Sequence, residues 1–573
     1  MKISKNPKAQ GTIEYLVIIA VVVVISLVVV SLMTTIFSSP ANQITSTAGK
    51  ISSATGSITI VDSATDSTGK TIVRVKNNSG ENISLTKVTL NGVENDFSEN
   101  ISLNDAKTLS LNSLVNCTNE NKTYVVKIYY TTQNGLTKEV NLGEMKIDCT
   151  EQITTPPNVI PTTSCFSTGT GALSTPKIIC DCNALQNINQ NLDWNYELGT
   201  DINCSLTKTW NSGKGFDPIN TFTGSLDGKT HTIYSLFSNH NYLDPIRWSS
   251  LFTEVGSSGS ISNLNLSDLN WIGEESAGIA YVNSGTITNC SVAGTLLVED
   301  EAGGLVSRND GGTIRNSTSN VTILQPITAS EANIGGFVSY NRGDIYNSVA
   351  MGKAIIYYSG VQGGFAGVND RGGHIYNSYS AVDINILPTG SNIMMGGFVG
   401  QNFETIDNSF TSGNIFLAEN YYSIIGGFAG YNVISSSAGT ITNSYSTGSI
   451  YCSNLCTDGM VGGFIGENRG ALVNTFSATE LILPAAFPRK SGFAATLTDA
   501  WSITNSYYDI NKTGLATCCS IACAGCTGKN TANSEPNYFF DGNNPPMGPK
   551  PTSWDFTTIW NDNNSTLQYP TLK

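Results

Sequence analysis

The sequence has few charged residues and almost no histidine. Asp, Glu, Lys and Arg make up 13% of the 573 residues, about half of the usual share. Acidic residues outnumber basic ones, 44 against 30, which argues against nucleic acid or an anionic membrane as the working partner. The three histidines, His231, His240 and His374, lie beside no candidate nucleophile, and a phosphate loop and a dinucleotide fingerprint are lacking. We therefore expect a protein that is not an enzyme.

Helical periodicity is also lacking between about residues 276 and 509, where a Gly-, Asn-, Ser- and Thr-rich pattern recurs instead. Two clear copies, 335–348 and 363–379, share Gly-Gly-Phe, a following Asn, and Ile-Tyr-Asn-Ser. Eight copies follow one another at intervals of 26 to 36 residues, counted at Gly278, Gly304, Gly336, Gly364, Gly397, Gly427, Gly463 and Gly492. A period of this size indicates one supersecondary unit stacked on itself.

The residue types predict which unit it is. Short apolar runs of β-branched and aromatic residues between turn formers are typical of a parallel β-solenoid, whose neighbouring coils lie roughly 4.8 Å apart. Separate domains are excluded, because about 30 residues cannot bury a core alone. We expect inward columns of Phe337, Phe365, Phe398, Phe428 and Phe464 and of Ile345, Ile375, Ile406, Ile441 and Ile503. We also expect a hydrogen-bonded column of Asn316, Asn347, Asn377, Asn408, Asn443, Asn474 and Asn505.

The consensus Gly-Gly-Phe-Val-Gly-x-Asn, followed by Ile-x-Asn-Ser-Tyr, resembles the GLUG repeat of large bacterial and archaeal surface proteins and adhesins. The resemblance covers roughly residues 185–573, and segments 196–202 and 222–233 look like the coils that precede such repeats. It implies a right-handed parallel β-helix that serves as a scaffold rather than as a catalytic set.

The one long apolar run, residues 16–33, follows Lys2, Lys5 and Lys8. It can nearly cross a bilayer as a helix, with its front end in the cytoplasm. A cleaved secretory signal would have a shorter apolar core and a small-residue cleavage site. The run is too long for that, which leaves a plain membrane anchor or a pilin-type segment.

Residues 9–15, Ala-Gln-Gly-Thr-Ile-Glu-Tyr, resemble the class III signal peptide of archaeal type IV pilins. The resemblance implies cleavage between Ala9 and Gln10 by a prepilin peptidase. It also implies that Glu14 contacts the free amino group of Gln10 in a neighbouring pilin subunit. A carboxylate at the edge of an apolar helix is costly in lipid without such a partner. The alternative is that Glu14 lies in the headgroup zone.

Alternating strands at 71–76, 85–90 and 124–130 predict a small antiparallel β-sandwich after the helix, as in archaeal pilins. The fold class is therefore mainly β, with one N-terminal hydrophobic helix. The predicted parts are a signal peptide (1–9), a transmembrane and assembly helix (10–37), a spacer (38–56), the pilin-like sandwich (57–149), a Thr/Pro linker (150–164), the first, capping coils of the solenoid (165–270), the repeat solenoid (271–510), and a Cys-rich segment with a C-terminal cap (511–573).

Cysteine usage indicates an oxidising compartment. Cys290 replaces the Ser of an Asn-Ser pair, so we expect a small buried filler. The other twelve cysteines are an even number, consistent with disulfides. Zinc is the alternative for the closely spaced cysteines of 518–526, although no His lies near them. The disulfide candidates are Cys117 with Cys149, and Cys452, Cys456, Cys518, Cys519, Cys523 and Cys526.

Candidate site residues are few. Carbohydrate cleavage would need paired carboxylates, and the candidates are Glu274, Glu275, Glu299, Asp300 and Glu301. The same acids could hold Ca²⁺, although no Asp-x-Asp spacing supports this, and we expect no cofactor and no metal. A solvated acidic loop is the simpler explanation. Tyr357, Tyr358, Tyr421 and Tyr422 could stack on sugars or proteins, or pack within loops.

Asn-x-Ser/Thr sequons mark glycosylation candidates in an exported chain: Asn77, Asn82, Asn100, Asn121, Asn265, Asn320 and Asn511. We expect Asn316, within the asparagine column, to be buried and unmodified. The overall prediction is a pilin-like adhesin of the archaeal cell surface, anchored in the membrane before assembly into a filament. It would present the solenoid to a surface glycan or protein. The alternatives are a membrane-tethered polysaccharide lyase or hydrolase and a passive envelope protein.

Overall fold

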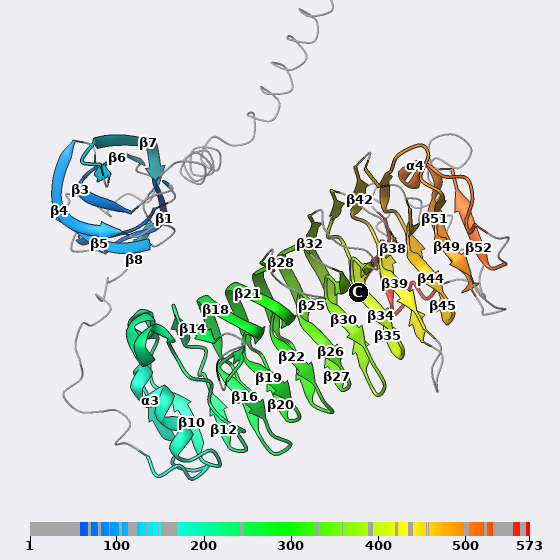
Figure 1. Ribbon diagram of the computed structural model, residues 1–573. Coiled ribbons are helices and arrows are strands. Elements are labelled where there is room, and N and C mark those ends of the chain that lie inside the picture. Colours follow the sequence, from blue (N-terminus) through cyan, green and yellow to red (C-terminus); the bar gives the residue numbers. More distant parts are fainter. Residues whose placement is uncertain are drawn as a thin grey trace, which may run out of the picture. The chain divides into compact units, whose positions relative to one another are not determined.

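The structure, a computed structural model, describes residues 58–150 and 169–530 apart from short internal segments, together with 554–561 and 569–573 (Figure 1). The predicted signal peptide, assembly helix and spacer lie outside the described residues, and so do Ala9, Gln10 and Glu14. In the described part of the chain, no helix has the length and hydrophobicity needed to span a bilayer. The chain divides into two compact units, Met1–Ile160 and Pro161–Lys573.

The first unit contains two sheets on a shared core. One has the strand order β5-β2-β1-β8, from β5 (Ala106–Asn112), β2 (Lys70–Asn77), β1 (Ile58–Asp66) and β8 (Asp148–Thr150). The other has the order β4-β3-β6-β7, from β4 (Val93–Ile101), β3 (Ile83–Leu90), β6 (Thr123–Thr132) and β7 (Thr137–Lys146). Val73 and Val75 of one sheet and Val88 and Ile128 of the other are buried together, because alternate side chains of a strand share a face. This is the predicted two-sheet arrangement, except that β1 and β8 pair in parallel.

The second unit is a parallel β-solenoid, as the repeats predict (Figure 1). Among the described residues, one sheet has nine strands: β16 (Phe252–Val255), β19 (Ala280–Asn283), β22 (Val306–Asn309), β26 (Val338–Asn341), β30 (Ala366–Asn369), β34 (Val399–Asn402), β39 (Ala429–Asn432), β44 (Ile465–Asn468) and β49 (Ala494–Leu497). Its strands pair in register from coil to coil, so that Val338 lies beside Ala366 and Ala366 beside Val399.

The second solenoid sheet has twelve strands in the described ranges: β9 (Lys177–Ile179), β10 (Asn195–Leu198), β12 (Ser225–Asp227), β17 (Ser260–Ser262), β20 (Thr286–Thr288), β23 (Thr313–Arg315), β27 (Asp344–Tyr346), β31 (His374–Tyr376), β35 (Thr405–Asp407), β40 (Thr440–Thr442), β45 (Ala471–Val473) and β50 (Ile503–Thr504).

The third sheet has twenty-three strands in the same described part: β11 (Ile202–Asn203), β13 (Thr232–Tyr234), β14 (Phe237–His240), β15 (Trp248–Ser249), β18 (Asn265–Ala277), β21 (Ser291–Gly303), β24 (Thr318–Leu324), β25 (Ala332–Gly335), β28 (Val349–Ile356), β29 (Gly360–Gly363), β32 (Tyr379–Ile386), β33 (Ile393–Gly396), β36 (Phe410–Thr411), β37 (Ile415–Leu417), β38 (Ser423–Gly426), β41 (Tyr445–Ser446), β42 (Ser449–Cys452), β43 (Met460–Gly462), β46 (Phe476–Ser477), β47 (Glu480–Ile482), β48 (Arg489–Ser491), β51 (Ser506–Asp509) and β52 (Cys526–Lys529).

The interior of the solenoid holds the repeated apolar residues. Phe337 and Phe365 stack with ring centroids 4.7 Å apart, and Phe365 and Phe398 with centroids 4.9 Å apart; all three are fully buried. Ile345 and Ile375 are fully buried as well. The parallel stacking follows from the coil spacing, because in-register strands hold equivalent side chains at one strand separation.

The asparagine prediction needs correction. The column exists in two parts, Asn316 to Asn408 and Asn443 to Asn505, with amide–amide distances such as 3.2 Å from Asn347 Nδ2 to Asn316 Oδ1. Between the two parts, Asn443 Nδ2 donates to Asp407 Oδ1 over 3.0 Å and not to Asn408. Asn316, Asn347 and Asn377 are exposed. Asn316 is therefore not buried, as we had expected. These residues have positive φ (+49° at Asn347), a conformation that Asn tolerates and that turns its side chain outward at a corner.

A second, buried asparagine column was missed. It is formed by the Asn that ends each of the seven inner strands of the nine-stranded sheet: Asn283, Asn309, Asn341, Asn369, Asn402, Asn432 and Asn468. Up to Asn432, each Nδ2 donates to the Oδ1 of the next coil, for example over 2.9 Å from Asn341 to Asn369 and over 2.8 Å from Asn369 to Asn402. The Gly-x-Asn of the repeat was the available signal for this column.

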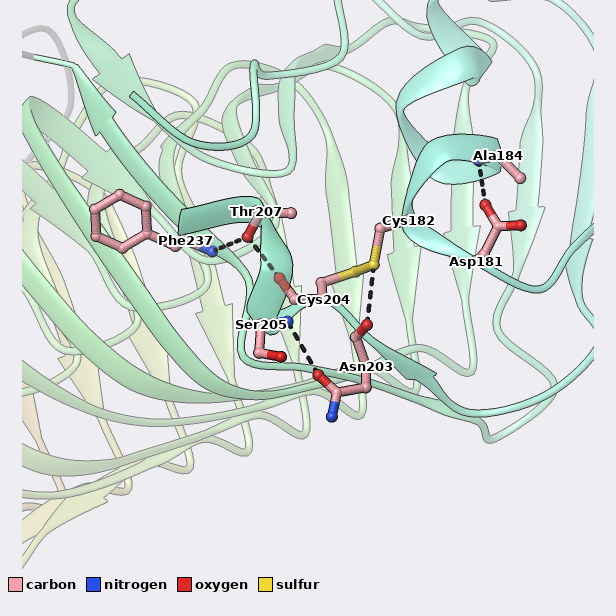
Figure 2. Close-up of a disulfide and its surroundings, with 8 residues drawn as sticks. All are labelled: Asp181, Cys182, Ala184, Asn203, Cys204, Ser205, Thr207 and Phe237. Atoms are coloured by element: carbon pink, nitrogen blue, oxygen red, sulfur yellow. Dashed lines mark hydrogen bonds between the residues drawn. A yellow bond between two sulfur atoms is a disulfide. The ribbon is translucent and has the colours of Figure 1, made fainter. Parts of the chain in front are cut away.

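Several cysteines of the solenoid unit form disulfides. Cys182, the first residue of α3 (Cys182–Gln186), is bonded to Cys204 (Figure 2). Two further disulfides, Cys452–Cys456 and Cys518–Cys526, join predicted candidates, and Cys519 is also disulfide-bonded. Cys117 and Cys523 lie outside the described residues, so the Cys117–Cys149 pairing stays a prediction. Cys290 is a free cysteine and only 2% exposed, which confirms the buried filler.

The C-terminal residues 554–561 and 569–573 lie on the flank of the solenoid. Trp554 packs against Phe476 with ring centroids 5.9 Å apart, and Trp560 packs against Tyr445 at the same centroid distance. Phe476 and Tyr445 belong to an outer aromatic column of β41 and β46. The chain therefore covers apolar surface that the repeats themselves leave outside.

Candidate functional site

The predicted carboxylates lie together on two neighbouring coils. Glu275 of β18 lies beside Glu301 of β21 in the parallel pairing. The register slips by one residue just before Glu275, so that Glu299 and Asp300 both lie opposite Glu274. The acidic residues of β18 therefore lie next to those of β21.

Arg308 of β22 binds the most buried of these acids. Its Nε lies 3.1 and 3.0 Å from the two carboxylate oxygens of Glu301, and its Nη2 lies 2.6 Å from one of them. The Ser307 hydroxyl donates to the same carboxylate over 2.7 Å. Glu301 is 3% exposed, and a buried charge requires such pairing. The geometry makes Glu301 the anchor that orients the guanidinium.

The remaining carboxylates differ in environment. Arg247 Nη1 lies 3.2 Å from Glu274 Oε2. Burial raises the pKa of Glu275, opposed by a hydrogen bond from the Tyr281 hydroxyl and reinforced by the charge of Glu301. Burial and the charge of Glu301 also raise the pKa of Asp300. In the described part of the chain, no three His, Cys, Asp or Glu side chains are grouped so that they could hold a metal ion.

A row of flat side chains runs along the axis beside these acids. We call it the aromatic row: Trp248, Tyr281, Arg308 and Tyr340. Trp248 stacks on Tyr281 with ring centroids 5.2 Å apart and an interplanar angle of 4°. The Arg308 guanidinium then lies between the rings of Tyr281 and Tyr340, 5.4 and 5.6 Å from their centroids. All four side chains are partly exposed, so their faces and edges can contact a ligand.

Sequence reasoning missed the aromatic row, because its members come from different repeats and are of different residue types. Tyr340 precedes the buried Asn341, and Arg308 precedes Asn309 in the coil before it. Only the register of the coils brings Arg308 beside Tyr340. An alignment of the repeats on the Gly-x-Asn asparagine could have found this pair.

Further along the axis the same flank becomes apolar. Met394, Ile424, Met460 and Ala495 form a cluster outside the main core. Two glycines of the repeats lie beneath such side chains: a Cβ at Gly466 would lie 2.7 Å from Ile424 Cγ2, and one at Gly400 would lie 2.5 Å from Val361 Cγ1. The motif therefore needs glycine here for close approach.

The other predicted contact residues are dispersed. Tyr422 is 38% exposed, with the Arg489 guanidinium 5.7 Å from its ring centroid. Tyr357 is partly buried, and Tyr358 and Tyr421 lie outside the described residues. Neither of the two described tyrosines, Tyr357 and Tyr422, belongs to the aromatic row.

With this geometry established, the chain can be compared with known proteins. No family model matches it. Halomucin of Haloquadratum walsbyi is 34% identical over 171 residues, which are 28% of this chain and 2% of halomucin. Immunoglobulin A1 protease of Streptococcus pneumoniae is 30% identical over 215 residues, which are 35% of this chain and 11% of the protease. The chain thus spans a small part of the length of the curated relatives that it matches.

Among solved structures, an IgA1 protease superposes with a TM-score of 0.32 and 15% identity, over 77% of this chain and 26% of that chain. Together, the β-solenoid and the two curated relatives fit an adhesin-like protein at the cell surface or outside the cell. They do not show the class III signal peptide or pilin assembly.

One expectation is wrong. The sequence predicts a protein that is not an enzyme, whereas the relatives include immunoglobulin A1 proteases from two sources. We therefore withdraw the exclusion of enzymatic activity. The low histidine content excludes one catalytic set only, and it says little about others.

Proposed function

We propose that this chain is a pilin-like surface adhesin, which assembles through its N-terminal helix and presents the solenoid for attachment. The observation that supports attachment is the aromatic row. There, partly exposed rings and one guanidinium, which Glu301 holds, follow one another along the solenoid axis. The ligand on this flank is a glycan or a protein of another surface.

Rigidity suits the aromatic row to binding. The Arg308 guanidinium is held in place by Glu301 and by two rings, so little side-chain entropy is lost on contact with a ligand. The same register position carries another aromatic residue, Tyr431, three coils beyond Tyr340, after Val368 and Gln401. Weak contacts repeated along an axis add up to useful avidity.

Assembly is the second part of the proposal, and it is supported by the resemblance of residues 9–15 to the pilin signal. The partners are a prepilin peptidase, other pilin subunits and, before assembly, the membrane. Mass spectrometry of the mature N-terminus from sheared surface filaments tests this part. We expect a chain that begins at Gln10; an intact Met1 confined to membranes would remove pilin assembly from the proposal.

A matched pair of variants sharpens the assembly test. Glu14→Gln should leave expression and cleavage intact but reduce incorporation into filaments, because the neutral amide cannot pair with an amino group. Glu94→Gln changes an exposed acid of β4 that pairs with Lys87 over 3.0 Å, and it should leave incorporation unchanged. Equal incorporation of both variants would contradict the role given to Glu14.

Attachment is tested with whole cells and with the purified full-length chain. Tyr340→Ala should weaken adhesion, whereas Phe416→Ala should not, although it removes a partly exposed ring that stacks on Tyr451 on another column. The same chain is incubated with polysaccharides and with immunoglobulin A1, and the products are analysed. Breakdown of either would indicate a tethered hydrolase or lyase. If the chain neither binds nor breaks down any of these, it is a passive envelope protein.

A further inference from the structure

An open polar pocket at the beginning of the solenoid belongs to none of the sites above. Its volume is about 410 Å³, within the range of small-molecule sites. It is lined by Asn183, Gln186, Asn187, Trp210, Asn211 and Asp217. The first three come from α3 and the adjoining η2 (Asn187–Gln190), and Trp210 and Asn211 come from η3 (Ser205–Gly213).

The walls of this pocket are fastened to one another. The disulfide joins Cys182, next to the lining residue Asn183, to Cys204, which immediately precedes η3 (Figure 2). The Gln186 side chain fastens α3 to the segment of Asp217, which forms the third wall. Its Nε2 donates to the Asp217 carbonyl over 2.8 Å, and its Oε1 accepts from the Asp217 backbone N–H over 3.0 Å. A site held in this way is preorganised, which reduces the entropic cost of binding.

A buried imidazole lies beside Asp217. His240 is 3% exposed and is not one of the residues that line the pocket. Its Nε2 makes no hydrogen bond to any part of the chain that the structure describes, and it lies 3.6 Å from Asp217 Oδ1. Asp217 Oδ2 accepts from Asn211 Nδ2 over 3.0 Å. Each oxygen of a carboxylate can accept more than one hydrogen bond, so Asp217 can also accept from a hydroxyl group in the pocket.

We infer that this pocket binds a neutral sugar residue. Side-chain amides both donate and accept, and a carboxylate accepts from hydroxyl groups, so the described lining suits a polyhydroxylated ligand. The partly buried indole of Trp210 offers an apolar face for the C–H face of a sugar ring. None of the six lining residues is Lys or Arg, and one is Asp, which disfavours acidic sugars and phosphates.

A sugar site here would supply the ligand class for attachment, and this biological role rests on the proposed function. Sugar binding itself can be measured with the purified full-length chain, using saturation-transfer NMR and tryptophan fluorescence. The probes are the methyl glycosides of glucose, galactose, mannose and N-acetylglucosamine, with glucuronic acid as the anionic comparison. We expect binding of at least one neutral glycoside and no preference for glucuronic acid.

Substitutions then locate the site. Trp210→Ala and Asp217→Asn should each weaken binding by about tenfold or more, and Trp210→Phe should retain part of it. Asp201→Asn is the control. Asp201 pairs with His231 over 3.1 Å and does not line the pocket, so this substitution should leave binding unchanged. Circular dichroism and mapping of the Cys182–Cys204 peptide show that each variant is folded.

Several results would overturn the inference: no transfer to any neutral glycoside, preferred binding of glucuronic acid, or binding that survives both substitutions in a folded chain. The filament test reports separately on the proposed function. A chain that starts at Gln10 in filaments but binds no sugar contradicts only the pocket, and a sugar-binding chain that keeps Met1 contradicts only assembly.

Discussion

The two asparagine columns of the solenoid allow one prediction in depth, because they share chemistry but differ in burial. Asn369 is fully buried; its Oδ1 accepts from Asn341 Nδ2 and its Nδ2 donates to Asn402 Oδ1. Asn377 is exposed, and its amide bonds to Asn347 and Asn408 over 3.2 and 3.1 Å. We compare Asn369→Ala with Asn377→Gly.

The expected magnitudes follow from what each substitution leaves behind. Asn369→Ala removes the bonds to Asn341 and Asn402, and also a longer bond of 3.4 Å from Asn369 Nδ2 to the Thr405 carbonyl. It leaves a buried donor on Asn341 and a buried acceptor on Asn402. At about 1–3 kcal/mol for each orphaned group, the expected loss is about 3–5 kcal/mol of unfolding free energy. At Asn377 water can replace the lost bonds, and glycine accepts the φ of +48° without strain. We expect a loss of about 1 kcal/mol or less there.

Hydrogen exchange followed by mass spectrometry measures both effects by region. In a solenoid each coil contacts only its neighbours, so Asn369→Ala should accelerate exchange in β26, β30 and β34 more than in β19. A denaturant titration of each variant gives the free energies. The reasoning fails if Asn377→Gly is as destabilising as Asn369→Ala, or if exchange rises equally in all coils.

Three further predictions concern burial and charge. Because burial raises the pKa of Glu275, the stability from this carboxyl is full below its ordinary pKa and is lost as pH rises through the folded value. Glu275→Gln should therefore raise Tm near neutral pH but not at about pH 4, as calorimetry can show. Burial raises the pKa of the Cys290 thiol to about 12, so iodoacetamide should label Cys290 only after unfolding in guanidinium, as peptide mapping by mass spectrometry would reveal. Trp554→Ala, which removes a 2% exposed indole, should cost about 3–5 kcal/mol and make residues 554–573 sensitive to limited proteolysis while the coils stay protected. Native labelling of Cys290, or an unchanged proteolysis pattern, would contradict the burial argument.

The repeat alone was sufficient to predict the solenoid and its interior phenylalanine column. In a parallel sheet that is in register, each coil places equivalent residues on top of one another, so a period in sequence becomes a column in space. Phe337, Phe365 and Phe398 needed no further information, because a Phe that recurs at the same place in five coils removes the most apolar area from water when it faces the shared core. The strands of the N-terminal sandwich were likewise apparent from alternation, as at Val73 and Val75.

The sequence could not determine which column faces inward or which residues of different columns contact one another. Which of the two asparagines in a repeat is buried depends on the direction in which a corner turns, and the positive φ at Asn347 turns that side chain outward while Asn341 stays inside. The pairing of Glu301 with Arg308 joins strands of two different sheets, and its acids are aligned by a one-residue slip in register.

The pocket and the C-terminal segment depend on tertiary structure for the same reason. Asn183 and Asp217 meet only because a disulfide and a side-chain amide bring separate segments together. Trp554 lies against Phe476 because residues 554–561 return to a flank that the repeats leave apolar. The sequence by itself thus determined the repeating coil, whose contacts recur at a constant separation. Contacts between residues at no constant separation were decided only by the tertiary structure, because no periodicity encodes them.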